Sequence, residues 1–402
     1  MSASGDSTLT TPCTNELTKT ILHNQVNIPA IDVLRGLAAL GVAWFHSRVD
    51  LWVGFKEIQT NPEGYSAIDR WTSWLSLPVS QLGSLVMLFF VLSGFCIHLP
   101  LAGKGRSPDL TSYAIRRGFR IYPAYFATLV FCYLSAMMLS LWLGTASLTG
   151  SESTLYVTSA LMLQNWVYNG GQIALNPSLW SIPVEVELYF VYPVLIWIHL
   201  RFGMAASFAF TLACTGIGWA LHFSGAAIAL GSFFKYAIIW NSGAWLAEHY
   251  VRQTLPKFTR WHLALLVLSL MLTPALGLKG VDVFYLHYGW GVASFLGLWW
   301  LITDGARFIP PNDWWVRWLA ALGTISYSLY LIHFPIFKIG GIFWIEIFQS
   351  KPSSFLVPSL ATLMVIPFAW VFYRLFEYPS HEIGRTIAKR IQKVPNKESA
   401  MP

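Results

Sequence analysis

The sequence predicts an all-α membrane protein, a polytopic helix bundle of about ten transmembrane helices with both the N- and C-termini in the cytosol. Three observations lead to this prediction. Of the 402 residues, 55% are hydrophobic and only 11% are charged, whereas a soluble domain carries about 25% charged residues. Apolar runs recur along the chain, and their length approaches the roughly 20 residues needed to cross a bilayer. Lys and Arg gather on alternate sides of these runs, as the positive-inside rule requires.

Ten apolar runs predict spans, and they cover residues 31–47, 82–101, 121–144, 178–200, 204–223, 230–248, 261–278, 284–303, 317–343 and 354–376. With the N-terminus in the cytosol, 19 of the 26 Lys and Arg residues fall in cytosolic segments and five in outer segments. An odd number of spans would destroy this bias. The net charge of +7 therefore reflects topology, and no nucleic-acid partner is expected. The apolar run at 154–168 is too short to span the membrane, and it predicts an interfacial or re-entrant helix.

The chain divides into a polar cytosolic tail at 1–28, one membrane domain at 29–380 and a basic cytosolic tail at 381–402. The first 28 residues lack the basic-then-apolar order of a signal peptide, so the first span is expected to insert as its own anchor. The four cysteines are scattered, and no pair has the spacing of a metal or redox site. We expect small buried cysteines and no metal ion.

The first span holds three ionisable groups, Asp32, Arg35 and His46, in the run IDVLRGLAALGVAWFHS. A charge at membrane depth is costly unless it faces a cavity or a partner. Because a helix turns about 100° per residue, Arg35 and His46 lie within about 20° of one another, and Asp32 lies within about 60° of both. Arg35 and His46 are roughly 16 Å apart along the axis. This alignment predicts the wall of an internal channel.

Three arginines, Arg116, Arg117 and Arg120, begin the third span in RRGFRIYP. Arg116 and Arg120 are four residues apart and share a helix face, and Arg117 lies beside them. Guanidinium groups grip phosphates through paired, charge-assisted hydrogen bonds, so a phosphate site is one interpretation. Topology signalling at a cytosolic helix end is the other.

The fourth span begins in NPSLWSIPVEVELYFVYP, where prolines break the backbone before Glu185 and Glu187. These carboxylates point about 160° apart on a helix, so both cannot line one cavity. Glu185 lies nearer the broken turn with Trp180 and Ser181 and is expected on the cavity side. A helix-start carboxylate favoured by the macrodipole is the alternative for either.

Residues 322–335, LGTISYSLYLIHFP, place Ser326, Tyr330 and His333 at helical spacing in one polar stripe. A lone intramembrane histidine is often only hydrogen-bonded to a neighbouring helix, but the stripe favours a functional role.

Two other segments have mainly structural interpretations. In LFFVLSGFCIHLP, Ser93-Gly94 favours a close helix approach or a kink. In the closing YRLFEYP, Arg374 and Glu377 are three residues apart and predict a local ion pair.

Taken in order, these segments resemble the acyltransferase-3 family of integral-membrane acyltransferases. The matching pieces are D-x-L-R-G-L with its later histidine (Asp32, Arg35, Gly36, His46), FFVLSGF (89–95), RRxxRIxP (Arg116, Arg117, Arg120, Pro123), WSxxVE (Trp180, Ser181, Glu185), GxISYSLYLxHxP (323–335) and E-x-P (Glu377, Pro379). Each motif is weak alone, but six in this order over residues 31–379 make a specific match. Two departures are Met87, where relatives often have a polar or acidic residue, and VEVELY in place of VEEQFY.

The resemblance implies transfer of an acyl group, usually acetyl from cytosolic acetyl-CoA, to a hydroxyl of a surface, exported or lipid-linked carbohydrate. It also implies that the protein lies in the inner (cytoplasmic) membrane of a bacterium. The partners that it implies for the protein are acyl-CoA, a carbohydrate or glycolipid acceptor, and the lipid bilayer. Because no extracellular esterase-like domain follows the tenth span, the protein would act alone or pass its acyl group to a separate extracytoplasmic transferase. The acceptor and the acyl chain length stay open.

The expected chemistry assigns a role to each residue. A hydroxyl attacking a thioester needs a base, and an imidazole with an ordinary pKa of about 6.5 suits the task. We expect a catalytic set of His46 as general base with Arg35, Asp32 and Glu185. The donor CoA is expected to contact Arg116, Arg117, Arg120 and Ser93, and the substrate Trp180, Ser181, Tyr330 and His333. An acyl-histidine intermediate is an open variant.

A proton-coupled transporter of a small anionic or sugar substrate is the competing hypothesis, because buried Arg, His and Glu also mark transport pathways. A transporter predicts internal repeats with paired broken helices, and the sequence has no clear repeat. This difference favours the enzyme.

Overall fold

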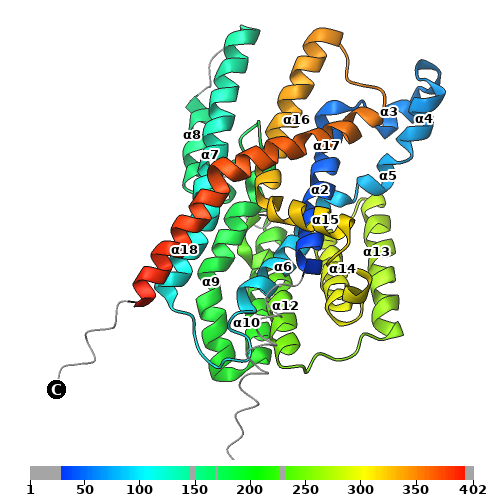
Figure 1. The fold of residues 1–402 in the computed structure, drawn as a ribbon. Coiled ribbons are helices and arrows are strands. Elements are labelled where there is room, and N and C mark those ends of the chain that lie inside the picture. The colour runs from blue at the N-terminus through cyan, green and yellow to red at the C-terminus, as the bar shows by residue number, and fades with distance from the viewer. Residues whose placement is uncertain (1–28, 145–149, 168–170, 227–230, 394–402) are drawn as a thin grey trace, which may run out of the picture.

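A computed structural model of the chain describes residues 29–144, 150–167, 171–226 and 231–393. Regular secondary structure in these ranges is entirely helical (Figure 1). The longer helices are α2 (Pro29–Leu51), α6 (Val86–His98), α7 (Leu110–Leu143), α8 (Gly150–Ala160), α9 (Ser181–Phe202), α10 (Met204–Phe223), α12 (Phe233–Val251), α13 (Arg260–Leu278), α14 (Val283–Thr303), α15 (Trp314–Thr324), α16 (Ser326–Phe348), α17 (Leu356–Phe372) and α18 (Tyr378–Lys393). The short helices α3 (Phe55–Thr60), α4 (Ala67–Ser73) and α5 (Ser76–Val79) lie between α2 and α6.

Each of the ten predicted spans coincides with helix, which confirms the all-α class. Seven described helical stretches are long and apolar enough to cross a membrane. They contain α6, α7, α9, α10, α13, α16 and α17, and the chain is accordingly an integral membrane protein. The spans predicted in α2, α12 and α14 hold polar groups such as Arg35, Lys235 and His287 and fall outside this count. The total of ten and the orientation of the termini stay predictions.

The ninth predicted span was wrong in one respect, because residues 317–343 form two helices that meet at Ile325. The break lies where α15 and α16 both pack against α2. A Cβ on Gly323 would lie 2.0 Å from the carbonyl oxygen of Asp32, and one on Gly36 would lie 2.4 Å from that of Leu319. The two glycines therefore let α15 contact the backbone of α2 directly, which a single straight helix would not reach.

A second close crossing joins α6 and α12. A Cβ on Gly94 would lie 1.9 Å from the carbonyl oxygen of Trp240, and one on Gly243 would lie 1.9 Å from that of Val91. This agrees with the structural interpretation of Ser93-Gly94, since glycine at a helix contact lets two backbones approach. The crossing also fixes the neighbouring Ser93, whose hydroxyl accepts from Trp240 Nε1 at 3.2 Å.

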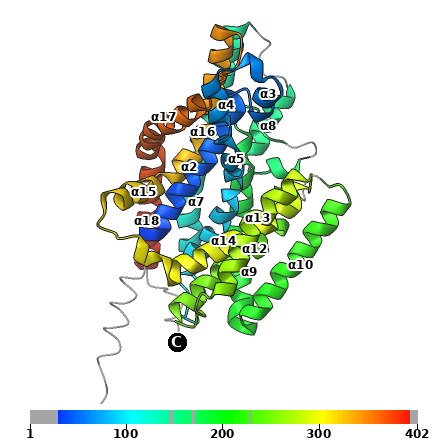
Figure 2. The ribbon, with the colours of Figure 1, turned by 90° about the vertical axis from the view of Figure 1, so that its right-hand side faces the viewer.

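Asp109 caps the N-terminus of the long helix α7, and its carboxylate accepts from the backbone N–H of Thr111 at 3.2 Å. The Ser112 hydroxyl also donates to this carboxylate and lowers the pKa of Asp109, which lies outside the spans. Helix α7 also packs against α18, and Figure 1 shows the two side by side, whereas in Figure 2 they are partly hidden behind α2. Residues 381–393, predicted as tail, belong to α18, whereas 1–28 and 394–402 lie outside the described residues.

A five-residue π-helix, Tyr373–Glu377, joins α17 to α18 and turns Glu377 into the core. Glu377 Oε2 accepts from the backbone N–H of Ser328 at 3.1 Å and from the Ser328 hydroxyl at 2.5 Å. The guanidinium of Arg374 instead lies over the rings of Trp370 and Tyr378. The predicted local ion pair between Arg374 and Glu377 is therefore not formed.

Candidate active site

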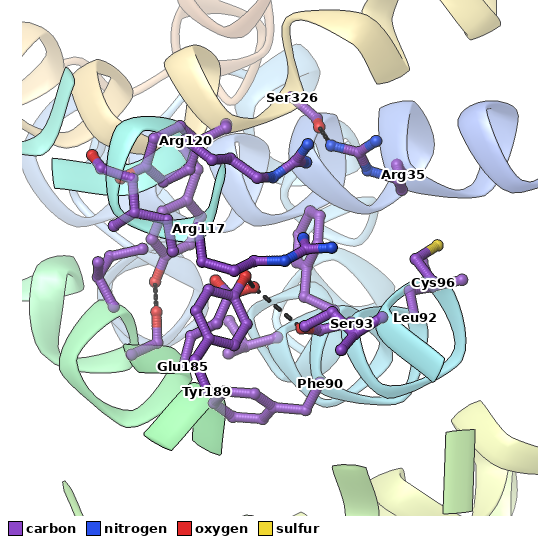
Figure 3. Close-up of a pocket in the computed structure, with 18 residues that line it drawn as sticks. Arg35, Phe90, Leu92, Ser93, Cys96, Arg117, Arg120, Glu185, Tyr189 and Ser326 are labelled. Atoms are coloured by element: carbon purple, nitrogen blue, oxygen red, sulfur yellow. Dashed lines mark hydrogen bonds between the residues drawn. The ribbon is translucent and has the colours of Figure 1, made fainter. Parts of the chain in front are cut away.

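A cavity of about 240 Å³ lies between α2, α6, α7, α9 and α16. Its polar lining includes Arg35, Arg117, Arg120, Ser93 and Glu185 (Figure 3). These residues come from segments that lie up to 150 positions apart in the chain (35 to 185). The sequence motifs that carry them therefore meet at one place in the fold.

Three guanidinium groups enter the cavity from two helices. In Figure 3 those of Arg117 and Arg120 point from α7 toward the space that Arg35 reaches from α2. Arg35 Nη2 donates to Ser326 Oγ at 3.2 Å, and its Nη1 lies 3.6 Å from Asp32 Oδ1. Arg117 lies over the Tyr189 ring at 5.6 Å, and its buried Nε has no hydrogen-bond partner among the described residues.

Glu185 is the carboxylate that faces these arginines. Its Oε1 accepts from Ser93 Oγ at 3.0 Å and from Tyr189 Oη at 2.6 Å. Glu187 lies outside the lining and accepts from Trp166 Nε1 at 2.6 Å and from the backbone N–H of Phe233 at 2.7 Å. With three cations and one carboxylate in the lining, the cavity suits an anionic guest.

Ser181 and Tyr330 close the cavity on the side of α9 and α16. Their hydroxyl groups are 2.7 Å apart, and Tyr330 Oη donates to the carbonyl oxygen of Ser178 at 2.6 Å. The Tyr330 ring contacts that of Phe89, which also lines the cavity. The Tyr330 ring also contacts that of His333, with centroids 5.6 Å apart.

His46 and His333 form a pair on the far side of Tyr330. His46 Nδ1 lies 2.9 Å from His333 Nε2, and His333 Nδ1 lies 3.0 Å from the carbonyl oxygen of Leu329. A carbonyl only accepts, so His333 Nδ1 carries the hydrogen, and in the neutral ring Nε2 is an acceptor. In this tautomer His46 donates through Nδ1, and its Nε2 carries the lone pair. The contacts of the pair thus favour one tautomer for each ring.

Several predicted site residues do not line the cavity. His333 lies next to the lining residue Tyr330, His46 lies next to His333, and Asp32 reaches the cavity only through Arg35. Arg116 is exposed. Trp180 turns away from the cavity and stacks on His287 with centroids 6.2 Å apart. The functional roles assigned to these residues stay predictions.

The sequence interpretation overlooked three residues that contribute to this region. Tyr189 and Cys96 line the cavity, and Glu377 reaches Ser328, two positions after the Arg35 partner Ser326. The E-x-P motif could have drawn attention to Glu377, but the spacing to Arg374 favoured a local ion pair. Tyr189 lies one helical turn after Glu185, which was a usable signal.

The arrangement defines a membrane protein with a cavity lined by three arginine side chains and a pair of histidines near it. Residues 28–374 match the family model Acyl_transf_3, described as an acyltransferase domain. The chain therefore belongs to this acyltransferase family, and the family supports a membrane acyltransferase over the transporter hypothesis.

Among curated proteins, the chain is similar to Nodulation protein 10 of Rhizobium leguminosarum bv. viciae. The two are 26% identical over 155 residues, which is 35% of this chain and 40% of the relative. The match thus spans less than half the length of that relative. No solved structure matches the chain.

Proposed function

We propose that the protein transfers an acetyl or other acyl group from cytosolic acyl-CoA to a hydroxyl of a surface, exported or lipid-linked carbohydrate, in the cytoplasmic membrane of a bacterium. The observation that carries the proposal is the convergence of Arg35, Arg117 and Arg120 on one cavity in a chain of an acyltransferase family. CoA carries several phosphate groups, and guanidinium groups bind phosphates through paired hydrogen bonds.

The donor would enter from the end where α7 begins. Arg117 and Arg120 would hold the phosphates, while the thin pantetheine arm would extend past Arg35 toward Tyr330. Ser93 and Glu185, held by Tyr189 and Trp240, would contact the arm rather than the phosphates, because a carboxylate repels them.

The chemical step needs a base for the acceptor hydroxyl. His46 Nε2 would take the hydroxyl proton as the oxygen attacks the thioester carbonyl. Collapse of the tetrahedral intermediate breaks the C–S bond, and the CoA thiolate then takes the proton from the imidazolium. His333 would hold His46 in the required tautomer, as the orienting partner of a catalytic histidine does. Because Tyr330 separates the cavity from this pair, its ring must move for the thioester to reach His46.

Cys96 gives a test of the donor site that needs no acceptor, since this free thiol lines the cavity. In a variant with Cys13, Cys132 and Cys214 replaced, acetyl-CoA should slow alkylation of Cys96 by N-ethylmaleimide. Arg117→Ala should remove this protection, and the exposed Arg116→Ala should keep it. An unprotected Cys96 in protein that still turns over acetyl-CoA would overturn the donor site.

His46 has its own test. His46→Ala should leave protein in the membrane, keep the protection of Cys96 and lose acyl transfer. The readout is the loss of hydrolysable acyl groups from cell-envelope and exported glycans, measured by mass spectrometry. Acyl groups at normal levels in the variant would exclude the general-base role.

A further inference from the structure

Three residues outside the cavity meet where the ends of three helices converge. His98 ends α6, His199 lies in the last turn of α9, and Glu248 lies in the last turn of α12. His98 Nε2 is 2.9 Å from Glu248 Oε2, and His199 Nε2 is 3.5 Å from Glu248 Oε1. The side chains of His98, His199 and Glu248 are 4%, 12% and 5% exposed. Two imidazoles thus face one buried carboxylate.

The surroundings orient two of these groups. His98 Nδ1 lies 3.1 Å from the hydroxyl of Tyr192, so its Nε2 points at Glu248. Glu248 Oε2 also accepts from the backbone N–H of Gly103 at 3.1 Å. Metal-binding histidines are typically held in this way, by a hydrogen bond at the ring nitrogen that does not bind the metal.

His199 lacks a comparable partner. Its Nδ1 is buried and has no hydrogen-bond partner among the described residues, and its Nε2 is at the limit of hydrogen-bond distance from Glu248. If Nδ1 carries the hydrogen, the Nε2 lone pair faces a carboxylate oxygen and is repelled. If Nε2 carries it, with or without a second hydrogen on Nδ1, the buried Nδ1 is left without a partner. A cation between Nε2 and Glu248 turns the repulsion of the first case into attraction, so the arrangement of the two side chains fits a bound ion.

We propose that His98, His199 and Glu248 bind a zinc ion that ties together the ends of α6, α9 and α12. One nitrogen of each histidine and one carboxylate oxygen lie within 4.8 Å of one another. With bonds of roughly 2.0–2.2 Å, the donors of a tetrahedral zinc site are about 3.3 Å apart, so small side-chain shifts complete it. Two histidines and a glutamate are a known zinc ligand set, with water in the fourth position. The members of this set share no local motif, so their spacing in the sequence does not group them.

Arg252 is compatible with this site. Its Nε contacts Glu248 Oε1, and its side chain is 52% exposed, so it lies at the solvent edge of the cluster. Oε2, which faces His98 and accepts from the Gly103 N–H, keeps a lone pair for the metal, and His199 Nε2 would reach the ion from the side of Oε1. The ion would also fix Gly103 and hence the segment that leads into α7. Ile97, which precedes His98 in the chain, lines the cavity. The proposed role of the zinc ion is therefore to hold this end of α6 in place and so to support the cavity wall.

The test uses the full chain, purified through a Strep tag to avoid nickel and added histidines. Metal content is measured by mass spectrometry after growth with zinc and removal of loosely bound ions. We expect about one zinc per chain in the wild type. His98→Ala and His199→Ala should lose it, whereas His222→Ala should keep it. His222 is a matched control, because its Nε2 lies 3.6 Å from Asp282 with no second imidazole in the pair.

Two further measurements keep the test independent of misfolded variants. Tyr192→Phe removes only the hydroxyl at His98 and should weaken zinc binding by about tenfold. A chelator should lower the melting temperature of the wild type, and added zinc should restore it. A wild type that neither contains nor binds zinc would overturn the proposal, as would zinc that remains in both His98→Ala and His199→Ala.

Discussion

Removing single arginines from the cavity should separate donor binding from chemistry. Arg117→Ala and Arg120→Ala each delete one guanidinium group that faces the cavity. A hydrogen bond to a charged group contributes about 1.5–3 kcal/mol, and 1.4 kcal/mol corresponds to a tenfold change in affinity. Each variant should therefore raise the KM for acetyl-CoA by about 10- to 100-fold, with a smaller change in kcat.

The double variant should lose less than the product of the two single effects. Arg117 and Arg120 are one helical turn apart and would hold the same phosphates, so their contributions are coupled. Arg117→Lys and Arg120→Lys should give intermediate KM values, because lysine keeps the charge and loses the paired hydrogen bonds.

The assay follows CoA release by a thiol reagent, with the protein in lipid nanodiscs and acetyl-CoA varied. Arg116→Ala is the matched control, since Arg116 is exposed on the same helix and lies outside the cavity lining. It should change KM by less than about twofold, the weak effect of a screened surface charge. If Arg116→Ala raised KM as much as Arg117→Ala, or if Arg117→Ala lowered only kcat, the assignment of the cavity to the donor phosphates would fail.

Three other variants test separate parts of the structure. His333→Ala removes the acceptor that orients His46 and should lower kcat by about 100-fold with an unchanged KM for acetyl-CoA; an unchanged kcat would contradict the pair. Tyr330→Ala should open the cavity toward His46 and raise acceptor-independent hydrolysis of acetyl-CoA, whereas Tyr330→Phe keeps the ring and should not; equal hydrolysis in both would exclude a barrier role. Gly94→Ala places a methyl group against the Trp240 carbonyl and should destabilise the protein by about 1–3 kcal/mol, seen as a lower melting temperature; Gly297→Ala, where the space is open, is the control.

The helices were predictable because each apolar run is long and bounded by charge, and lipid allows few alternatives to a helix. The break at Ile325 was not, because it depends on Gly36 and Gly323 meeting across 287 positions (36 to 323). Hydrophobicity does not report such a backbone contact. It reports only that both segments avoid water.

The cavity was predictable as a set of motifs but not in its detailed lining. Helical spacing puts both Arg116 and Arg117 near the face of Arg120, and which one turns inward depends on how α7 packs against α9 and α18. Glu377 was misassigned because a π-helix adds a residue to the turn and changes the direction of the side chain. The His98, His199 and Glu248 cluster joins segments with no common spacing, so only the fold brings them together.

The first span explains how the proposed donor site and the proposed base can be separate and still cooperate. Arg35 and His46 face the same side of α2, yet the cavity includes Arg35 and stops at Tyr330 before His46. A thioester held among the arginines would therefore stay apart from the imidazole until Tyr330 moves. Such separation protects a reactive acyl donor from water, since an open path would let water replace the acceptor hydroxyl. On this reasoning the distance along α2 sets the length of the path that the acyl group must travel, and Tyr330 decides when the path is open.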